Sequence, residues 1–372
     1  MKKEMSLYHL IVATVFAGIL LTAGIYYAIN ILVDGDRALC PTCYDGTELD
    51  VQDPVSALNR AFYQNEEGLA LIHKLQYRLL GIVNHPTVIA GERGFLFAAL
   101  DEETGYDYLA DYTGHARFSD EEMGMILAEL QARQASYAAR GCEYYLVILP
   151  NAQTIYSEYM PAYYGSISQD TRLSVLERYL AENDYNGVID IRRDLLEAKS
   201  DGWLYNNTEN SLNALGLYHT YRAVYRCFSS EVAENMDVLE RDELEFYYHQ
   251  TAGKWLAKRA ELEDVVENRT VSLSNNTRLN YRFLTNSPAA TSIMLPFYVG
   301  SEASGSPELL LQFCGTWERL LIEPFFSNTF GKVTYQVGLE DDPTIFEAAD
   351  PKVVFQFVYE NQLSVLLPSD RN

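Results

Sequence analysis

Residues 144–161, YYLVILPNAQTIYSEYMP, contain the segment that decides the fold. The run 144–149 is apolar throughout and stops at Pro150, which is typical of a strand buried on both faces of a parallel sheet. Helical spacing of apolar residues over 119–140 precedes this strand, and a second helical pattern over 168–183 follows it. A buried strand between two amphipathic helices predicts an α/β protein.

Further segments continue this alternation of strands and helices. Strands are predicted at 187–191, 309–314, 332–337 and 353–359, and helices at 212–230 and 317–329. Together they predict a parallel sheet that is covered by helices on both faces. Ligands of such sheets bind beyond the carboxyl ends of the strands. We therefore expect Asn151, Asp190 and the turn at 315–316 to lie along one edge of the sheet.

Three other stretches complete the predicted organisation. Residues 34–86 are expected to form a stalk and amphipathic helices, with helical spacing over 54–83. Residues 87–97, TVIAGERGFLF, predict two short extended pieces around a turn bounded by glycines. The stretch 231–305 interrupts the alternation and is expected to be an insertion that caps the ligand edge of the domain 87–372.

The N-terminal residues 1–33 predict a cytoplasmic tip and one transmembrane helix. The 24 residues from Leu10 to Val33 carry no charge, a length that spans a bilayer as a helix. Lysines precede this segment and acids follow it, so the positive-inside rule keeps the N-terminus in the cytoplasm. A cleaved signal peptide fits less well, because the apolar run is too long and no small-x-small site ends it. We expect a single-pass protein of the cell membrane with an extracytoplasmic globular domain.

The charge and cysteine content exclude several classes of function. The chain has 52 acidic and 28 basic residues and a formal charge of -24, which disfavours nucleic acid as a partner. Its five cysteines are an odd number, so a complete disulfide framework is not expected. Cys40 and Cys43 could form a local disulfide or half of a metal site. No second cysteine pair or histidine cluster supplies the remaining ligands, so neither a metal nor a cofactor is predicted.

Five segments in a shared order resemble one family. They are GERGFLF at 91–97, YYLVILPNAQTIYSEYMP at 144–161, LYNNTENSLNALGLYHTY at 204–221, PELLLQFCGTWERLLIEPFFSNTF at 307–330 and VVFQFVYENQL at 353–363. The chain from residue 87 onward is similar to the SGNH-hydrolase-like proteins of the alginate O-acetyltransferase and DHHW families. Each motif is weak alone, and their common order makes the resemblance specific.

The resemblance implies a flavodoxin-like three-layer α/β/α fold and a role at cell-surface polysaccharides. Members of the family transfer acetyl groups to glycan hydroxyls, often together with a multispanning membrane O-acyltransferase. That chemistry needs a Ser nucleophile, a His that takes its proton and an Asp that orients the His, because a serine hydroxyl is a weak nucleophile on its own.

The third segment departs from the family motif at the catalytic positions. The Asp and the His of the family correspond to Glu209 and Ser211, and its Trp corresponds to Leu212. The surrounding framework matches at Thr208, Asn213, Gly216 and Tyr218. The proton acceptor of the family is therefore missing from its expected position.

The other polar positions of the family are replaced as well. In FCGTW, Gly315 stands in place of the family's Asp and Thr316 in place of its Ser, with Trp317 in place of Phe. Ala152 replaces the Lys of the second segment, and Asn361 replaces the Arg of the closing segment. Several polar groups are thus lost together, while the apolar framework around them is kept.

Two readings of function follow. A non-catalytic protein that binds glycan or scaffolds an O-acetylation complex is favoured, because Thr316 has no activating base in sequence. Its ligand cleft would lie between Asn151, Glu209 and Thr316, and the candidates for ligand binding are Asn151, Asn213, Trp317 and His219. The alternative is an active O-acyltransferase or esterase with a rebuilt Thr/His site. His219, about 12 Å along the predicted helix from Ser211, or His249 in the insertion would then be the base.

Overall fold

The computed structural model describes residues 66–227, 236, 238–274, 277, 281–283, 297–301, 306–314 and 317–368. The contacts divide the chain into two units, Met1–Asn84 and His85–Asn372. In the first unit, helix α3 (Glu66–Leu80) falls within the predicted helical stretch 54–83. None of the helices in the described ranges is long and apolar enough to cross a membrane. The predicted span 10–33 and the pair Cys40 and Cys43 lie outside the described residues.

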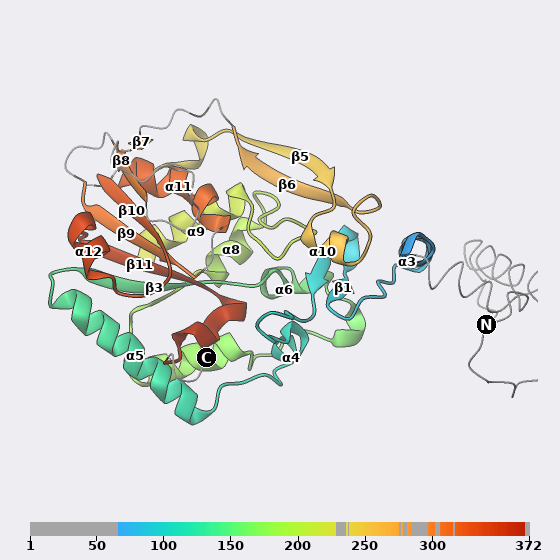
Figure 1. The fold of residues 1–372 in the computed structure, drawn as a ribbon, viewed down its shortest axis with the longest axis horizontal. Helices are drawn as coiled ribbons and strands as arrows, with labels where there is room; N and C mark the ends of the chain where they lie inside the picture. Colours follow the sequence, from blue (N-terminus) through green and yellow to red (C-terminus); the bar gives the residue numbers. More distant parts are fainter. Residues whose placement is uncertain are drawn as a thin grey trace, which may run out of the picture. The chain divides into compact units, whose positions relative to one another are not determined.

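The second unit is built on a sheet of seven strands in the order β4-β3-β11-β9-β10-β8-β7 (Figure 1). The first five of these are parallel: β3 (Glu143–Leu149), β4 (Val188–Asp190), β9 (Glu308–Phe313), β10 (Lys332–Val337) and β11 (Val353–Tyr359). Each of the five coincides with a strand predicted from the sequence. The parallel sheet is therefore confirmed.

Two short strands extend this sheet with the opposite direction. Strands β7 (Tyr281–Phe283) and β8 (Phe297–Ser301) pair with each other and β8 pairs with β10, all antiparallel. Both lie in the stretch 231–305, for which the sequence predicts an insertion that caps the ligand edge. In the structure, these two parts of the stretch belong to the main sheet. Strands of three and five residues are too short to give a clear pattern in sequence.

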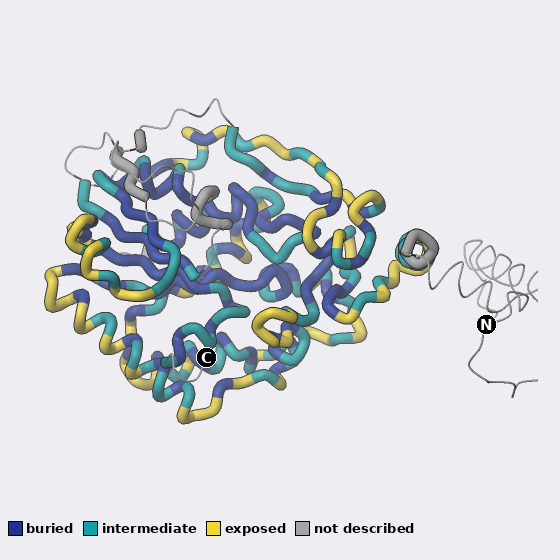
Figure 2. The backbone as a smooth tube through the Cα atoms, in the orientation of Figure 1, coloured by how far each residue is buried: buried dark blue, intermediate teal, exposed yellow. Residues whose placement is uncertain are grey.

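Helices cover both faces of the sheet and give three layers. On one face lie α5 (Asp120–Ala138), α7 (Arg172–Glu182) and α12 (Pro343–Ala349), and on the other lie α8 (Arg192–Ala198), α9 (Ala214–Cys227) and α11 (Trp317–Thr329). Within β3, Leu146 and Ile148 face the α5 side, whereas Val147 and Leu149 face the α9 side. Figure 2 shows the residues of the central strands coloured as buried along most of their length, so both faces of these strands are covered. This double burial explains why their sequences are apolar without alternation.

Three buried glutamines interrupt the apolar strands at the same level. Gln312 on β9 is in register with Gln336 on β10 and with Gln356 on β11. The Nε2 of Gln356 donates to Oε1 of Gln312 at 2.6 Å, and the Nε2 of Gln312 donates to Oε1 of Gln336 at 3.0 Å. Tyr144 on β3 also donates to Oε1 of Gln356, at 2.6 Å. A one-residue slip would break this chain of hydrogen bonds, so it supports the register of the sheet.

Smaller elements surround the carboxyl end of the sheet. They are the hairpin of β1 (Val88–Ala90) and β2 (Leu96–Ala98), the hairpin of β5 (Phe246–Ala252) and β6 (Glu267–Leu273), and the short helices α4 (Tyr108–Tyr112), α6 (Ala152–Ile155) and α10 (Trp255–Arg259). Gly91 allows the first hairpin to pack closely against the segment 144–161. A Cβ at Gly91 would lie 2.5 Å from the Phe97 ring and 2.7 Å from the carbonyl oxygen of Tyr159, so no larger residue is accommodated.

Candidate functional site

The candidate site lies where β3 and β11 end side by side. Leu149 of β3 is in register with Tyr359 of β11, so the residues that follow these strands meet at one edge. Glu360 comes directly after β11 and is 1% exposed. Its Oε2 accepts hydrogen bonds from the backbone N of Asn151 at 2.6 Å and from Oγ1 of Thr154 at 2.7 Å. One carboxylate thus holds the turn between β3 and α6.

Asn210 connects the segment 204–221 to the same turn. Its Oδ1 accepts a hydrogen bond from the backbone N of Ala152 at 2.8 Å, and its Nδ2 donates to Oδ1 of Asn151 at 3.3 Å. Tyr205 donates from its hydroxyl to the carbonyl oxygen of Pro150 at 2.6 Å. Two of the segments that carry the family resemblance therefore meet at the carboxyl edge of the sheet.

Ser211 is held in a local turn and has no imidazole beside it. Its Oγ accepts a hydrogen bond from Nδ2 of Asn206 at 3.1 Å, and its carbonyl oxygen accepts one from the N of Asn206, also at 3.1 Å. The histidines described in the second unit are engaged elsewhere: His85 with Thr87, His115 with Thr113, His219 with Asp201, and His249 with the ring of Tyr247. Within the described residues, no histidine hydrogen-bonds to Ser211, Asn210 or Asn151.

Glu209 lies beside two cations of the insertion. Burial raises the pKa of its carboxyl, and the positive charges of Lys254 and Lys258 partly oppose that rise. The neighbouring Thr208 is fully buried and accepts at Oγ1 from the backbone N of Lys254 at 2.9 Å, and at its carbonyl oxygen from the N of Leu256 at 3.0 Å. Residues of the predicted insertion are therefore bound directly to the motif.

Asn213 directly precedes α9 and His219 lies on it, and each has a role in holding that helix. Asn213 is 1% exposed and caps α9, because its Oδ1 accepts from the N of Leu215 at 3.0 Å and from the N of Gly216 at 3.1 Å. His219 bonds through Nε2 to Oδ2 of Asp201 at 2.9 Å. Burial lowers the pKa of this imidazole, and the Asp201 carboxylate partly opposes the shift. Neither side chain is joined to Ser211 or to Asn151.

Three predicted residues are beyond what the structure describes. Gly315 and Thr316 lie outside the described residues, and Trp317 is described only through the backbone of α11, which it begins. Their assignment to the site remains a prediction from sequence.

The structure adds polar residues that the sequence analysis missed. Asp111 on α4 is 3% exposed, accepts at Oδ2 from the hydroxyl of Tyr106 and at Oδ1 from the N of Arg172, and lies near Glu360. Burial and the Asp111 charge raise the pKa of Glu360 to about 7. The sequence could have indicated Glu360, because it is an acid directly after a buried strand. It could not have indicated Asn210, because this residue occupies an unspecified position of the family motif.

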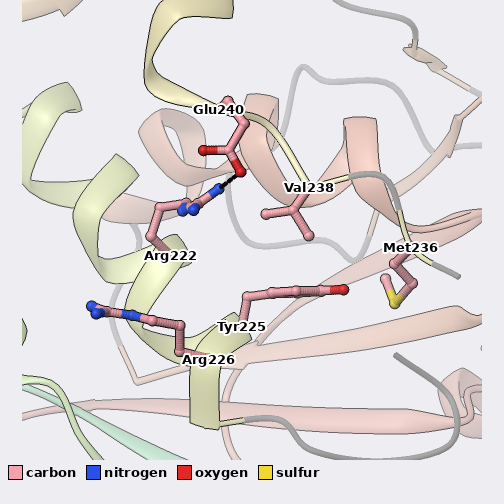
Figure 3. A pocket seen from close by; sticks show the side chains of 6 residues that line it. All are labelled: Arg222, Tyr225, Arg226, Met236, Val238 and Glu240. Atoms are coloured by element: carbon pink, nitrogen blue, oxygen red, sulfur yellow. Dashed lines mark hydrogen bonds and ion pairs between the residues drawn. The ribbon is translucent and has the colours of Figure 1, made fainter. Parts of the chain in front are cut away.

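A pocket lies beside the C-terminal half of α9 (Figure 3). It has a volume of about 470 Å³ and is lined by Arg222, Tyr225, Arg226, Met236, Val238 and Glu240. Arg222 is bonded to Glu240 at 2.7 Å, and Arg226 pairs with Asp194. Because both guanidinium groups already have carboxylate partners, we do not assign an anion site here. In the described part of the chain, no three His, Cys, Asp or Glu side chains are grouped to hold a metal.

The described residues form a three-layer α/β/α fold with polar side chains at the carboxyl edge of its parallel sheet. No protein-family model matches the chain, and no curated protein matches it significantly in sequence. Among solved structures, Bacillus cereus PatB1, determined with a sulfonyl adduct, is similar at a TM-score of 0.55 and 10% identity, over 76% of this chain and 96% of that chain.

Two further solved structures are similar at TM-scores of 0.49 and 13% identity. They are the O-acetyltransferase domain of Pseudomonas putida AlgJ, over 77% of this chain and 95% of that chain, and a DHHW family protein from Eubacterium siraeum, over 77% and 96%. The similarity to PatB1, at a TM-score of 0.55, confirms the resemblance at the level of the fold.

Proposed function

We propose that this chain is a membrane-anchored, extracytoplasmic SGNH-like protein that serves polysaccharide O-acetylation without catalysing it, as a glycan-binding or scaffolding component. The ordered motifs and the fold shared with PatB1 support the link to this family. The uncharged segment 10–33 supports anchoring. Cell-surface glycan and a multispanning membrane O-acyltransferase are the proposed partners.

The observation that carries the non-catalytic role is the environment of Ser211. At the position of the family's base stands a hydroxyl that is bonded to Asn206, and within the described residues no imidazole reaches it. A serine or threonine hydroxyl without a base remains protonated and weakly nucleophilic. The loss of a triad base lowers the rate by several orders of magnitude.

The same edge retains groups that suit a sugar ligand. The amides of Asn151 and Asn210 each have donor and acceptor atoms, as do sugar hydroxyls, and Glu209 adds an acceptor beside Lys254 and Lys258. Sugar sites combine a few oriented polar groups with an aromatic face. Trp317 at the start of α11 is the proposed aromatic group.

Catalysis is tested with the purified full-length chain and acetylated ester substrates. We expect hydrolysis and transfer at the background rate, equal for the wild type and for Thr316→Ala. Activity well above background that is lost in Thr316→Ala would refute the non-catalytic role, and His219 or His249 would then be tested as the base.

Binding is tested on arrays of acetylated and deacetylated cell-surface polysaccharides. We expect Asn210→Ala to weaken retention at least about fivefold, since it removes two hydrogen bonds at the edge. Asn186→Ala is the control, because Asn186 is exposed beyond the opposite end of β4. If the wild type is retained on no glycan, the glycan-binding role is wrong and the scaffolding role remains. Co-purification of an O-acyltransferase with the chain tests that role.

The proposed topology is tested by adding protease to intact spheroplasts that express the chain. We expect digestion of everything after about residue 34. Complete protection of the globular unit would place it in the cytoplasm and contradict the proposal.

A further inference from the structure

A small cavity lies at the carboxyl ends of β3 and β11, bordered by Asn151, Thr154 and Glu360 of the candidate site. Its volume of about 10 Å³ is near the lower limit for one water molecule or one ion. Asp111, Gln153, Thr154, Thr171, Tyr108 and Glu360 are among the residues that line it. All of these side chains carry oxygen.

Gln153 supplies the clearest sign that the cavity has an occupant. This side chain is 3% exposed, and its Nε2 donates to the carbonyl oxygen of Ala98 at 2.5 Å. Its Oε1 is buried and has no hydrogen-bond partner. A buried amide oxygen without a partner costs free energy, and nearly all such groups in folded proteins are satisfied. The cavity is the place where its partner fits.

Two carboxyl groups face the same space. Glu360 and Asp111 are almost completely buried, and the negative charge of Asp111 adds to burial in raising the pKa of Glu360. The Oδ1 of Asp111 is bonded to the N of Arg172 at 2.5 Å, and its Oδ2 to the hydroxyl of Tyr106. These are neutral donors, so they do not cancel the charge of the pair.

The charges around the pair also leave an excess of negative charge. Glu177 and Asp190 both bond to the guanidinium of Arg192, the second at 2.9 Å. The guanidinium of Arg172 lies over the rings of Tyr106, at 5.2 Å, and Phe118, at 4.8 Å. The network therefore holds four carboxyl groups, namely Asp111, Glu177, Asp190 and Glu360, against the two guanidinium groups of Arg172 and Arg192. If all four ionise, two negative charges remain without a cation.

We propose that this cavity binds one hard divalent cation, of the Ca²⁺ or Mg²⁺ class, through the carboxylates of Asp111 and Glu360 and the amide oxygen of Gln153. Oxygen donors of carboxylates, amides and hydroxyls are the ligands that these cations prefer. A divalent ion balances the two excess charges and supplies the missing partner of Gln153. Since Glu360 also holds the N of Asn151, the ion stiffens the turn that forms the floor of the candidate site.

Thermal unfolding of the full-length chain, purified in detergent and stripped with EDTA, tests the site. We expect 10 mM CaCl₂ or MgCl₂ to raise the Tm by about 2 to 4 °C over NaCl of equal ionic strength. Equilibrium dialysis with Ca²⁺ should give one ion per chain at pH 8 and weaker binding at pH 6, because protons compete for the carboxylates. Gln153→Leu and Glu360→Gln should abolish the shift. Asp341→Asn, at a half-exposed acid that pairs with Arg140, is the matched control and should retain it.

A gain-of-function variant keeps the test decisive if Glu360→Gln fails to fold. Gln153→Glu places a third carboxylate in the cavity and should increase the affinity for Ca²⁺ at least about tenfold, while lowering the Tm in EDTA. An identical response in Asp341→Asn and Gln153→Leu would overturn the proposal, as would the absence of any divalent effect in both the wild type and Gln153→Glu. The cavity would then hold a water molecule and a proton shared by the two acids.

Discussion

The carboxylate of Glu360 accepts a hydrogen bond of 2.6 Å from the backbone N of Asn151, and this bond joins the ends of two neighbouring parallel strands. Parallel strands have no short turn to fix their ends relative to each other. Here a buried acid does so, and the hydroxyl of Thr154 completes the arrangement at 2.7 Å. The geometry of the candidate site therefore depends on a residue that is not among those proposed to contact the sugar.

Loss of this carboxylate should strongly destabilise the globular unit. We expect Glu360→Ala to lower the free energy of unfolding by about 3 kcal/mol, because it leaves the N of Asn151 and the hydroxyl of Thr154 buried without an acceptor. Chemical denaturation measures this. Glu347→Ala, at an exposed position of α12, should change stability by less than about 0.5 kcal/mol. Equal effects of the two substitutions would contradict the role given to Glu360.

The stability of the ion-free protein should fall as the pH rises through neutrality. Burial raises the pKa of Glu360 from about 4.5 to about 7 and that of Glu177 from about 4.5 to about 8. A raised folded pKa means that the native state holds a proton which the unfolded state releases, so stability is complete below about pH 4.5 and is lost through pH 7 to 8. In EDTA we expect a higher Tm at pH 5.5 than at pH 8.5. Glu360→Gln should remove the part of the stability loss that occurs near pH 7. An unchanged dependence of the Tm on pH in this variant would refute the role given to Glu360.

The central part of the fold could be predicted because its strands are buried on both faces. The apolar runs at 144–149 and 353–359 correspond to β3 and β11 within one residue. Strands β7 and β8 escaped prediction, since their few residues have no distinct period and their position depends on pairing with β10. Tertiary pairing of this kind leaves no local signal.

The site was less predictable than the fold. The family motifs located Asn151 and the segment around Ser211, because residues at the carboxyl ends of parallel strands must meet. Asp111 and Gln153 were not found, since one isolated acid or amide in a sequence does not reveal which partners burial will give it. His219 was a candidate ligand by its place after the motif, and only the structure shows that its Nε2 bonds to Asp201.

Gly216 and Gly124 should respond to alanine in opposite directions. A Cβ at Gly216 would lie 2.2 Å from the carbonyl oxygen of Leu204, a backbone atom that cannot move without shifting the motif. Gly216→Ala should therefore cost about 2 kcal/mol or more, as overpacking does. At Gly124 in α5 the nearest atom, the hydroxyl of Tyr179, lies 3.6 Å away. Gly124→Ala should stabilise the protein by about 0.5 to 1 kcal/mol through helix propensity. Chemical denaturation measures both variants, and changes in the free energy of unfolding with the same sign would contradict this prediction.

Thr208 should control how firmly the hairpin of β5 and β6 and helix α10 are held on the motif. Its Oγ1 accepts from the N of Lys254 at 2.9 Å and donates to Oδ1 of Asn268 at 2.7 Å. Thr208→Val keeps the shape but leaves both partners unsatisfied in a buried place, which we expect to cost about 2 kcal/mol. Thr220→Val is the matched control, since among the described residues its buried hydroxyl bonds to the carbonyl oxygen of Gly216 within α9 alone.

Hydrogen exchange separates a local effect of Thr208→Val from a global one. We expect faster exchange at 246–273, and above all at the N of Lys254 and Leu256, with unchanged protection of β3 and β11, because the lost bonds join the hairpin to the motif and not the strands to one another. The control Thr220→Val should leave exchange at 246–273 as in the wild type. Equal acceleration over the whole sheet in Thr208→Val would mean that the hairpin unfolds only together with the rest of the unit, and the proposed local attachment would be wrong.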